Sequence, residues 1–229
     1  AWAGNTWVQL SPASSPPGRN GHVMSTDPAH GEIVLYSGHH DGTYLSDTWT
    51  WDGSSWSQES PATNPGGRSW ATMDFNPALG LTVLFAGTGT WTDSTWAWDG
   101  SEWTALTLAT DPDIQRGPAM SFDPSMGDLV SVGGLRGGTT DETWTYGPPA
   151  GVNGNWSEES PAHRPPGLRG AAMTFDQANG EIVLFGGSDA TYLDETWVWD
   201  GDDWTQKQPA HSPPARANAG MAFDAANGE

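Results

Sequence analysis

A tryptophan-rich motif recurs along the chain and limits the possible folds more than any other feature of the sequence. It occurs as TWTWDGSSW at residues 48–56, as TWAWDGSEW at 95–103 and as TWVWDGDDW at 196–204. Each copy places an Asp-Gly pair between two runs of β-prone residues, which is a strong signal for a β-hairpin. In the first copy we expect antiparallel strands at 48–52 and 54–57, joined by a type I′ turn at the Asp-Gly pair.

A second landmark, an arginine that ends a polar or Pro/Gly-rich stretch, measures the repeat. Successive spacings are 49, 48, 53 and 47 residues for Arg19, Arg68, Arg116, Arg169 and Arg216. Each arginine precedes a small-residue strand, a turn and an apolar strand such as EIVLYSG or EIVLFGG, and then the tryptophan hairpin. The sequence therefore repeats one unit of four strands, named A to D in chain order, with D followed by a D–A linker. We expect all five arginines to be structural, with each guanidinium holding the linker through its carbonyl groups.

Repeated four-stranded antiparallel units of this length are typical of a β-propeller. No stretch shows the three-to-four spacing of apolar residues that a helix requires. We therefore expect an all-β fold in a single domain, 1–229, with complete blades at about 19–61, 68–109, 116–161 and 169–209.

The Gly-Gly that ends strand B, the paired aromatic residues of strands C and D, and the arginine before the next strand A resemble the kelch repeat. The motifs DTWTWDG and SPPGR resemble those of bacterial secreted kelch-like proteins. The resemblance covers nearly the whole chain and implies a kelch-type propeller. It implies no particular function, because this fold carries both enzymes and binding proteins.

Both ends of the sequence match incomplete units. Residues 1–12 resemble a lone D strand, and 216–229 resemble a lone A strand. Strands A and D are separated by two strands within a blade, a gap of roughly 14 Å, so these two cannot pair directly. We expect the chain to be a segment of a six- or seven-bladed propeller. The alternative is that partner subunits supply the missing strands.

Most tryptophans recur in every unit, and for these we expect a structural role between blades, where a large aromatic ring buries much apolar area. The expectation applies to Trp49, Trp56, Trp96, Trp103, Trp144, Trp156, Trp197 and Trp204. Trp70 and Trp91 occupy positions that other residues hold in the other units, which makes them better candidates for a functional role.

Composition excludes several classes of partner. The chain has 28 acidic residues against eight Lys and Arg, for a net charge of −20, which argues against binding nucleic acid or an anionic membrane. No apolar stretch is long enough to span a bilayer, so we expect no membrane insertion. There is no cysteine, and therefore neither a disulfide nor a thiolate metal ligand.

Motifs for catalysis or cofactor binding are weak. Kelch-type propellers include the central domain of galactose oxidase, whose copper site uses a Tyr cross-linked to a Cys. This chain has no Cys, so the same site cannot form within it. His39, His40 and Asp41 are candidate metal ligands, but neighbouring residues in an extended chain point in opposite directions. We expect no cofactor, no metal and no catalytic residue among the motifs.

Function is then expected in the loops between strands B and C and in the D–A linkers, which by the family resemblance meet at one face near the central channel. The binding-face candidates there are Asn20, Tyr44, Trp70, Trp91, Arg136, Tyr192 and Asn218. An aromatic rim over a channel suits a carbohydrate or a protein loop. We expect a non-enzymatic binding or scaffold module of a bacterial extracellular or cell-surface protein. The alternatives are a repeat protein that forms oligomers or filaments through unfilled blade edges, and a propeller-type hydrolase or lyase.

Overall fold

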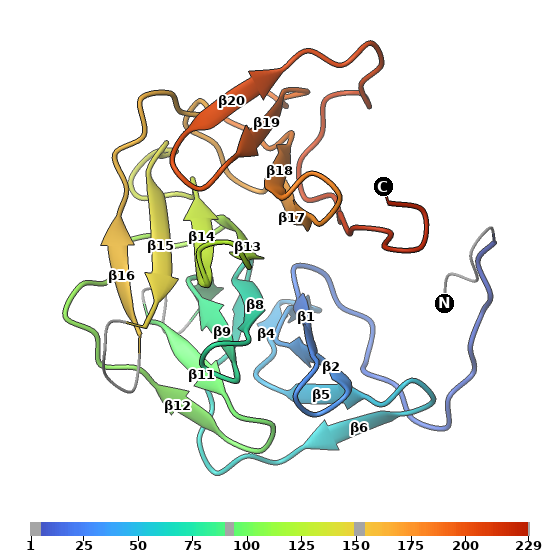
Figure 1. Ribbon diagram of the computed structural model, residues 1–229. Helices are drawn as coiled ribbons and strands as arrows, with labels where there is room; N and C mark the ends of the chain where they lie inside the picture. The colour runs from blue at the N-terminus through green and yellow to red at the C-terminus, as the bar shows by residue number, and fades with distance from the viewer. Residues whose placement is uncertain (1–5, 90–93, 149–153, 229) are drawn as a thin grey trace.

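The fold consists of four four-stranded antiparallel sheets and two short two-stranded ones (Figure 1). It is described by a computed structural model for residues 6–89, 94–148 and 154–228. No helix occurs in these ranges, and accordingly none that is long and apolar enough to cross a membrane. The four sheets contain β1 (Val23–Asp27), β2 (Glu32–Tyr36), β5 (Thr48–Trp51) and β6 (Trp56–Glu59); β8 (Thr72–Asn76), β9 (Leu81–Phe85), β11 (Trp96–Trp98) and β12 (Trp103–Ala105); β13 (Ala119–Asp123), β14 (Asp128–Val132), β15 (Thr143–Gly147) and β16 (Asn155–Glu158); and β17 (Ala172–Asp176), β18 (Glu181–Phe185), β19 (Thr196–Trp199) and β20 (Trp204–Lys207).

The sheets are arranged as the blades of a β-propeller, which confirms the predicted fold class. Within each sheet the strands are paired in chain order, so the predicted strands A to D lie side by side. The A strands β1, β8, β13 and β17 are successive neighbours on the inner side of the arc, and the D strands lie outermost (Figure 1). Both ends of the described chain lie at the open side of the arc (Figure 1).

Two short sheets brace the loops at one end of the blades. β3 (His39–His40) pairs with β4 (Thr43–Tyr44) inside the B–C loop of the first blade. β7 (Arg68–Ser69), which belongs to a D–A linker, pairs with β10 (Thr88–Gly89) in the B–C loop of its own blade. These pairings bring the two kinds of loop together at one face, where the sequence led us to expect binding residues.

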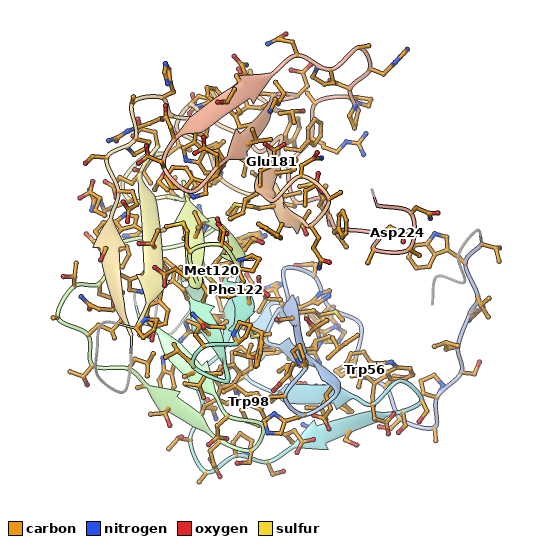
Figure 2. All side chains as sticks on the ribbon, in the orientation of Figure 1. Trp56, Trp98, Met120, Phe122, Glu181 and Asp224 are labelled. Atoms are coloured by element: carbon orange, nitrogen blue, oxygen red, sulfur yellow. The ribbon has the colours of Figure 1, made fainter. Side chains whose placement is uncertain are left out.

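Tryptophans of the D strands fill the seams between neighbouring blades. Trp103 is almost fully buried, stacks at 4.9 Å from Tyr36 of the preceding blade, and donates its indole N–H to Thr48 Oγ1 at 2.9 Å. The same indole-to-threonine bond recurs in the next two seams, from Trp156 to Thr95 and from Trp204 to Thr143, at 2.9 Å each. Trp98 is fully buried in the first of these seams (Figure 2). The expected structural role is thus visible for Trp103, Trp156 and Trp204 as buried area with satisfied indole donors. The buried indole N–H of Trp98, in contrast, has no hydrogen-bond partner within the described residues.

Tryptophans of the C strands bond locally instead. The indole N–H groups of Trp49, Trp144 and Trp197 donate to a carboxylate two residues earlier, over 2.7, 3.1 and 2.8 Å. Trp96 makes the same bond to the hydroxyl of Ser94. The acidic residues two positions before these C-strand tryptophans therefore accept hydrogen bonds from indole N–H groups.

A buried carboxylate ties three inner strands together. Asp74 on β8 accepts from Ser25 Oγ of β1 at 3.2 Å and from the backbone N–H of Phe122 on β13 at 2.9 Å. Burial raises the pKa of Asp74 above its ordinary value, and these hydrogen bonds oppose that rise. The contact couples the first three blades around the channel.

The expected two-residue type I′ turn is wrong. β5 ends at Trp51 and β6 begins at Trp56, so the connection has four residues. Asp52 Oδ1 accepts from the backbone N–H groups of Ser54 and Ser55 at 2.8 Å each, and only the following glycine, Gly53, has positive φ, at 94°. The carboxylate satisfies backbone donors that would otherwise need cross-strand partners, which favours the longer loop.

The two partial units form no strand in the described residues 6–22 and 208–228. The turn expected after the lone A strand is nevertheless present, because Asp224 accepts from Ala226 N at 3.0 Å and from Gly228 N at 2.8 Å (Figure 2).

Candidate functional site

A ring of backbone hydrogen bonds crosses the blades where each D–A linker enters its inner strand. Trp70 N donates to Gly21 O at 3.0 Å, Gly117 N to Trp70 O at 2.8 Å, Gly170 N to Gly117 O at 2.8 Å and Asn218 N to Gly170 O at 2.7 Å. All five residues have φ between 55° and 72°. The ring marks equivalent positions in five successive units and forms the mouth of the central channel.

Trp70 is exceptional within this ring. Three of the five positions are glycine, which adopts positive φ freely, whereas a bulky side chain there is strained by about 1–2 kcal/mol. The Trp70 side chain is not buried in return, since the residue is 42% exposed. A strained and exposed aromatic residue at a repeated glycine position is a reason to look for function.

A pocket of about 580 Å³ opens beside Trp70, at the mouth of the channel. This volume lies within the range of small-molecule sites, roughly 300–1,000 Å³. Its walls come from four D–A linkers and from the B–C loop of the fourth blade. The lining residues are Trp70, Arg116, Gly117, Arg169, Gly170, Ser188, Asp189, Ala190, Thr191, Tyr192 and Asn218.

The two arginines of this pocket are out of register with the other three. Arg19, Arg68 and Arg216 stand five positions before a methionine of the inner strand or its equivalent, whereas Arg116 and Arg169 stand four before theirs. The backbone agrees, because Gly87 N donates to Gln115 O and Gly187 N donates to Arg216 O, which makes Gln115 the equivalent of Arg216. Successive side chains of an extended segment point to opposite sides, so a shift of one residue redirects the guanidinium.

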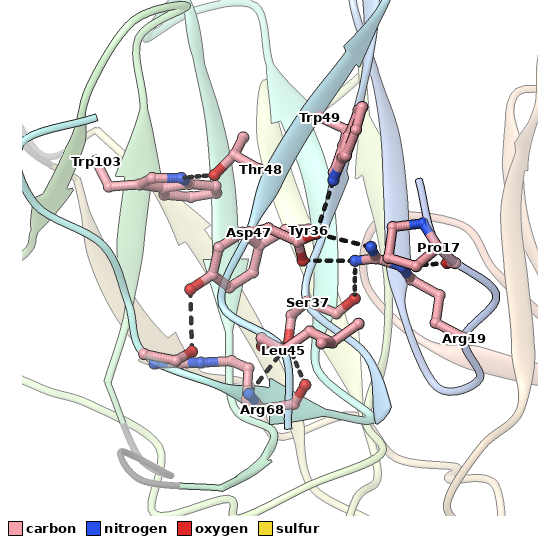
Figure 3. A network of polar contacts seen from close by, with 11 residues as sticks. Pro17, Arg19, Tyr36, Ser37, Leu45, Asp47, Thr48, Trp49, Arg68 and Trp103 are labelled. Atoms are coloured by element: carbon pink, nitrogen blue, oxygen red, sulfur yellow. Dashed lines mark hydrogen bonds and ion pairs between the residues drawn. The ribbon is translucent and has the colours of Figure 1, made fainter. Parts of the chain in front are cut away.

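The arginines that stand five positions before the methionine form the first register, and Arg19 and Arg68 among them bond linker carbonyls, as expected. Figure 3 shows the contacts of the Arg19 guanidinium. Arg19 bonds Asp47 through two nitrogens at 2.6 and 2.7 Å, and also donates to the carbonyls of Pro17 and Ser37. Arg68 is fully buried and donates to the carbonyls of Ala86 and Pro65. Burial lowers the pKa of Arg68 to about 10.

Arginines of the second register do not behave in this way, and the expected linker role is wrong for both. Arg116 and Arg169 are half-buried and line the pocket. The Arg116 guanidinium lies 5.4 Å from the centre of the Trp70 ring, a cation–π distance. Within the described part of the chain, neither guanidinium has a hydrogen bond to a carbonyl or an ion pair with a carboxylate.

The loop 188–195 completes the pocket wall. The backbone of Ser188 forms isolated antiparallel β-bridges with Arg169 and with Tyr192. Asp189 N donates to Thr191 O at 3.1 Å. Asp189 also accepts from Thr139 Oγ1 of the preceding blade at 2.9 Å. These contacts leave Tyr192 at the rim with 68% of its surface exposed.

The expected binding residues are only partly brought together. Trp70, Tyr192 and Asn218 line the pocket, and Asn20 lines the adjoining channel. Tyr44 and Arg136 line neither cavity, and Arg136 is paired with Glu142 at 2.9 Å. Trp91 lies outside the described residues. Sequence reasoning missed Arg116, Arg169 and Asp189, although the shortened spacing from arginine to methionine was a usable signal for the first two.

The channel next to the pocket has a volume of about 810 Å³ and is lined by the entry segments of the inner strands. His22 is among its lining residues, and burial, together with the nearby Arg19 charge, lowers the pKa of its imidazole. Trp70, Gly117, Gly170 and Asn218 line both cavities, so the pocket continues into the channel.

The candidate metal ligands His39, His40 and Asp41 lie along the β3–β4 hairpin and do not converge on one point. His39 lies edge-on to the Tyr44 ring with centroids 5.3 Å apart, while His40 Nε2 lies 3.4 Å from Asp41 Oδ2. Across the described ranges, no group of three or more His, Cys, Asp or Glu side chains is placed to hold a metal ion.

Comparison with known proteins supports the propeller fold and gives no information on function. No family model matches the sequence, and no curated protein sequence matches it. Among solved structures, this chain is similar to the one titled "Structure of YjhT", with a TM-score of 0.71 and 14% sequence identity, over 90% of this chain and 75% of that chain. At this identity the likeness concerns the propeller fold alone.

Proposed function

We propose that the chain is a kelch-type propeller that binds a glycan in the pocket at the mouth of the channel, as part of an extracellular or cell-surface protein. The single observation that carries the proposal is Trp70, an exposed indole kept in a strained conformation at a position where other units use glycine. Strain of this kind persists where the surrounding structure compensates for it or where function requires the side chain.

The walls of the pocket have the mixed character that carbohydrate recognition requires. Trp70 and Tyr192 offer flat apolar surfaces with polar edges, and Ser188, Asp189, Thr191 and Asn218 offer hydrogen-bonding groups. The rigid sheets beneath hold these loops in place, which reduces the entropy lost on binding.

A glycan array with two variants tests this proposal. Trp70→Gly should abolish binding while the backbone is retained, because glycine occupies the ring position in three other units. Tyr44→Ala is the matched control, since Tyr44 is 39% exposed, close to the 42% of Trp70, but lies outside the pocket. Equal glycan binding by the wild type and Trp70→Gly would contradict the proposal.

A second candidate function, assembly through blade faces, has an observation in its favour. Met24 on β1 is 43% exposed, whereas the equivalent Met73 and Met120 are 5% and 7% exposed, because each packs on a preceding blade. A second copy could cover this face. Light scattering over a range of concentrations tests the idea: Met24→Glu should prevent assembly, and a monomer at all concentrations would exclude it.

A hydrolase or lyase function has less support. Glycoside hydrolysis ordinarily uses two carboxyl groups flanking the scissile bond. Of the described residues that line the pocket, only Asp189 carries a carboxylate, and it already accepts from Thr139. Binding without turnover is therefore the simpler use of this pocket.

A further inference from the structure

The charge distribution in the pocket runs against that of the whole chain. The protein has 28 acidic residues and only eight Lys and Arg. Two of these eight cations, Arg116 and Arg169, nevertheless face the same pocket, where Asp189 is the only acidic lining residue in the part of the chain that the structure describes. The pocket is thus locally cationic in a strongly anionic protein.

Neither cation forms an ion pair with a described residue of the protein. Arg19 and Arg136 each form an ion pair, and the buried Arg68 bonds two carbonyls. Arg116 and Arg169 are half-buried, but within the described residues neither has an anionic or carbonyl partner. Within the described residues, both guanidinium groups that line this pocket therefore keep hydrogen-bond donors that a ligand can use.

Guanidinium groups with free donors are suited to one class of ligand. The planar fork of N–H groups matches a carboxylate and can bind it through two parallel hydrogen bonds. In a half-buried pocket such a bond is screened by water less than at an open surface. Arg116 is further oriented by its position against the Trp70 ring.

We propose, on the basis of the glycan-binding function above, that the pocket is specific for an acidic saccharide, with Arg116 and Arg169 binding its carboxylate. Trp70 and Tyr192 lie on the same pocket walls and provide surface for the sugar ring. Asp189 can accept hydrogen bonds from sugar hydroxyl groups, and the Asn218 amide can both accept and donate. An anion approaching from solution is repelled by the overall charge of −20, so the preference arises from contacts within the pocket rather than from long-range attraction.

Calorimetric titration with matched saccharides provides the test. The probes are a disaccharide that contains glucuronate, the same disaccharide with glucose in its place, a sulfated neutral disaccharide and a short acidic peptide. We expect the glucuronate form to bind at least roughly tenfold more tightly than the glucose form. Arg169→Gln should lower the affinity for the glucuronate form to about that for the glucose form, and so remove this preference.

Two further variants make the result specific. Arg169→Lys keeps the charge but not the fork, and should recover only part of the preference. Arg164→Gln is the matched control, because Arg164 is also half-buried and without an ion pair in the described ranges, but lies outside the pocket. It should bind both saccharides as the wild type does.

The outcomes separate this inference from the proposed function. Equal affinity for the glucuronate and glucose forms would overturn the inference and leave glycan binding standing. Tighter binding of the sulfated form than of the glucuronate form would overturn the assignment of a carboxylate and indicate that the arginines bind a sulfate ester. Binding of the acidic peptide alone, or of no probe, would overturn both proposals.

Discussion

Arginine and tryptophan occur both in the seams between blades and at the mouth of the channel, but their surroundings differ. In the seams, Arg68 is fully buried with two carbonyl partners, and Trp103 is buried with its indole N–H on Thr48. At the mouth, Arg169 has no such partner among the described residues, and Trp70 is 42% exposed.

The difference shows that a repeated residue type does not have one role in a propeller. In the seams, Arg68 and Trp103 donate hydrogen bonds to protein acceptors, and these bonds contribute to stability. Side chains displaced by one residue face the pocket and keep unused hydrogen-bonding capacity, which a ligand can take up. Substitutions in the seams should therefore change stability, and matched substitutions at the mouth should change binding.

The largest effect on stability is expected for Arg68→Met. Loss of the guanidinium leaves the carbonyls of Ala86 and Pro65 without their donor, which should lower the free energy of unfolding by about 3–5 kcal/mol. Arg169→Met, the same change at the mouth, should cost less than about 0.5 kcal/mol. Urea denaturation measures both. Equal costs would refute the distinction between the two arginine registers.

The next largest effect is expected for Asp47→Asn, at about 2 kcal/mol, because it weakens the charged hydrogen bonds to Arg19. Burial disfavours ionised Asp47, but hydrogen bonds from Arg19 and Trp49 outweigh burial and hold its pKa below 3.8. The stabilisation is therefore present above pH 3.8 and is lost as the pH falls through the lower folded-state value. Denaturation at several pH values should show the wild type and the variant converging in acid, whereas a constant difference would argue against the ion pair.

A smaller effect, about 1–2 kcal/mol, is expected for Thr48→Val, which leaves the buried indole N–H of Trp103 without an acceptor. Thr196 occupies the corresponding position in the fourth blade and has no such indole partner within the described ranges. Thr196→Val should therefore be nearly neutral. Thermal and urea unfolding of the two variants provide the comparison, and similar losses would show that the indole bond is not the cause.

A small effect on stability is expected for Trp70→Gly. Relief of about 1–2 kcal/mol of backbone strain offsets the lost contacts of a partly exposed indole, so the free energy of unfolding should change by less than about 1 kcal/mol. Binding should nevertheless be lost. A large loss of stability would instead place Trp70 with the structural tryptophans of the seams.

Much of the fold could be predicted because its signals are local. The Asp-Gly hairpins, the arginine landmarks and the apolar B strands are each contained in a few consecutive residues. Asp224 illustrates this independence, since it organises its turn through Ala226 and Gly228 even though no strand forms on either side.

The candidate site was predicted less well, for two physical reasons. The sequence comparison treated Arg68 and Arg116 as equivalent positions. The backbone hydrogen bonds of the linkers instead make Gln115 the equivalent of Arg68. The direction of the Arg116 side chain therefore could not be predicted from the spacing of the arginines alone. The positive φ of Trp70 is imposed by the hydrogen bonds that its backbone makes to Gly21 and Gly117, both of which belong to other units.

The amino-acid sequence alone established the four-stranded unit, its repetition and the propeller, because turns and alternating strands depend on interactions between residues that are close in the chain. Tertiary structure was needed to distinguish buried from available side chains. Thr48 and Trp103 are 55 positions apart, and the pocket combines four linkers with a loop of the fourth blade. Whether a guanidinium or an indole is satisfied depends on which distant residues lie beside it, and that is determined only when the blades pack around the channel.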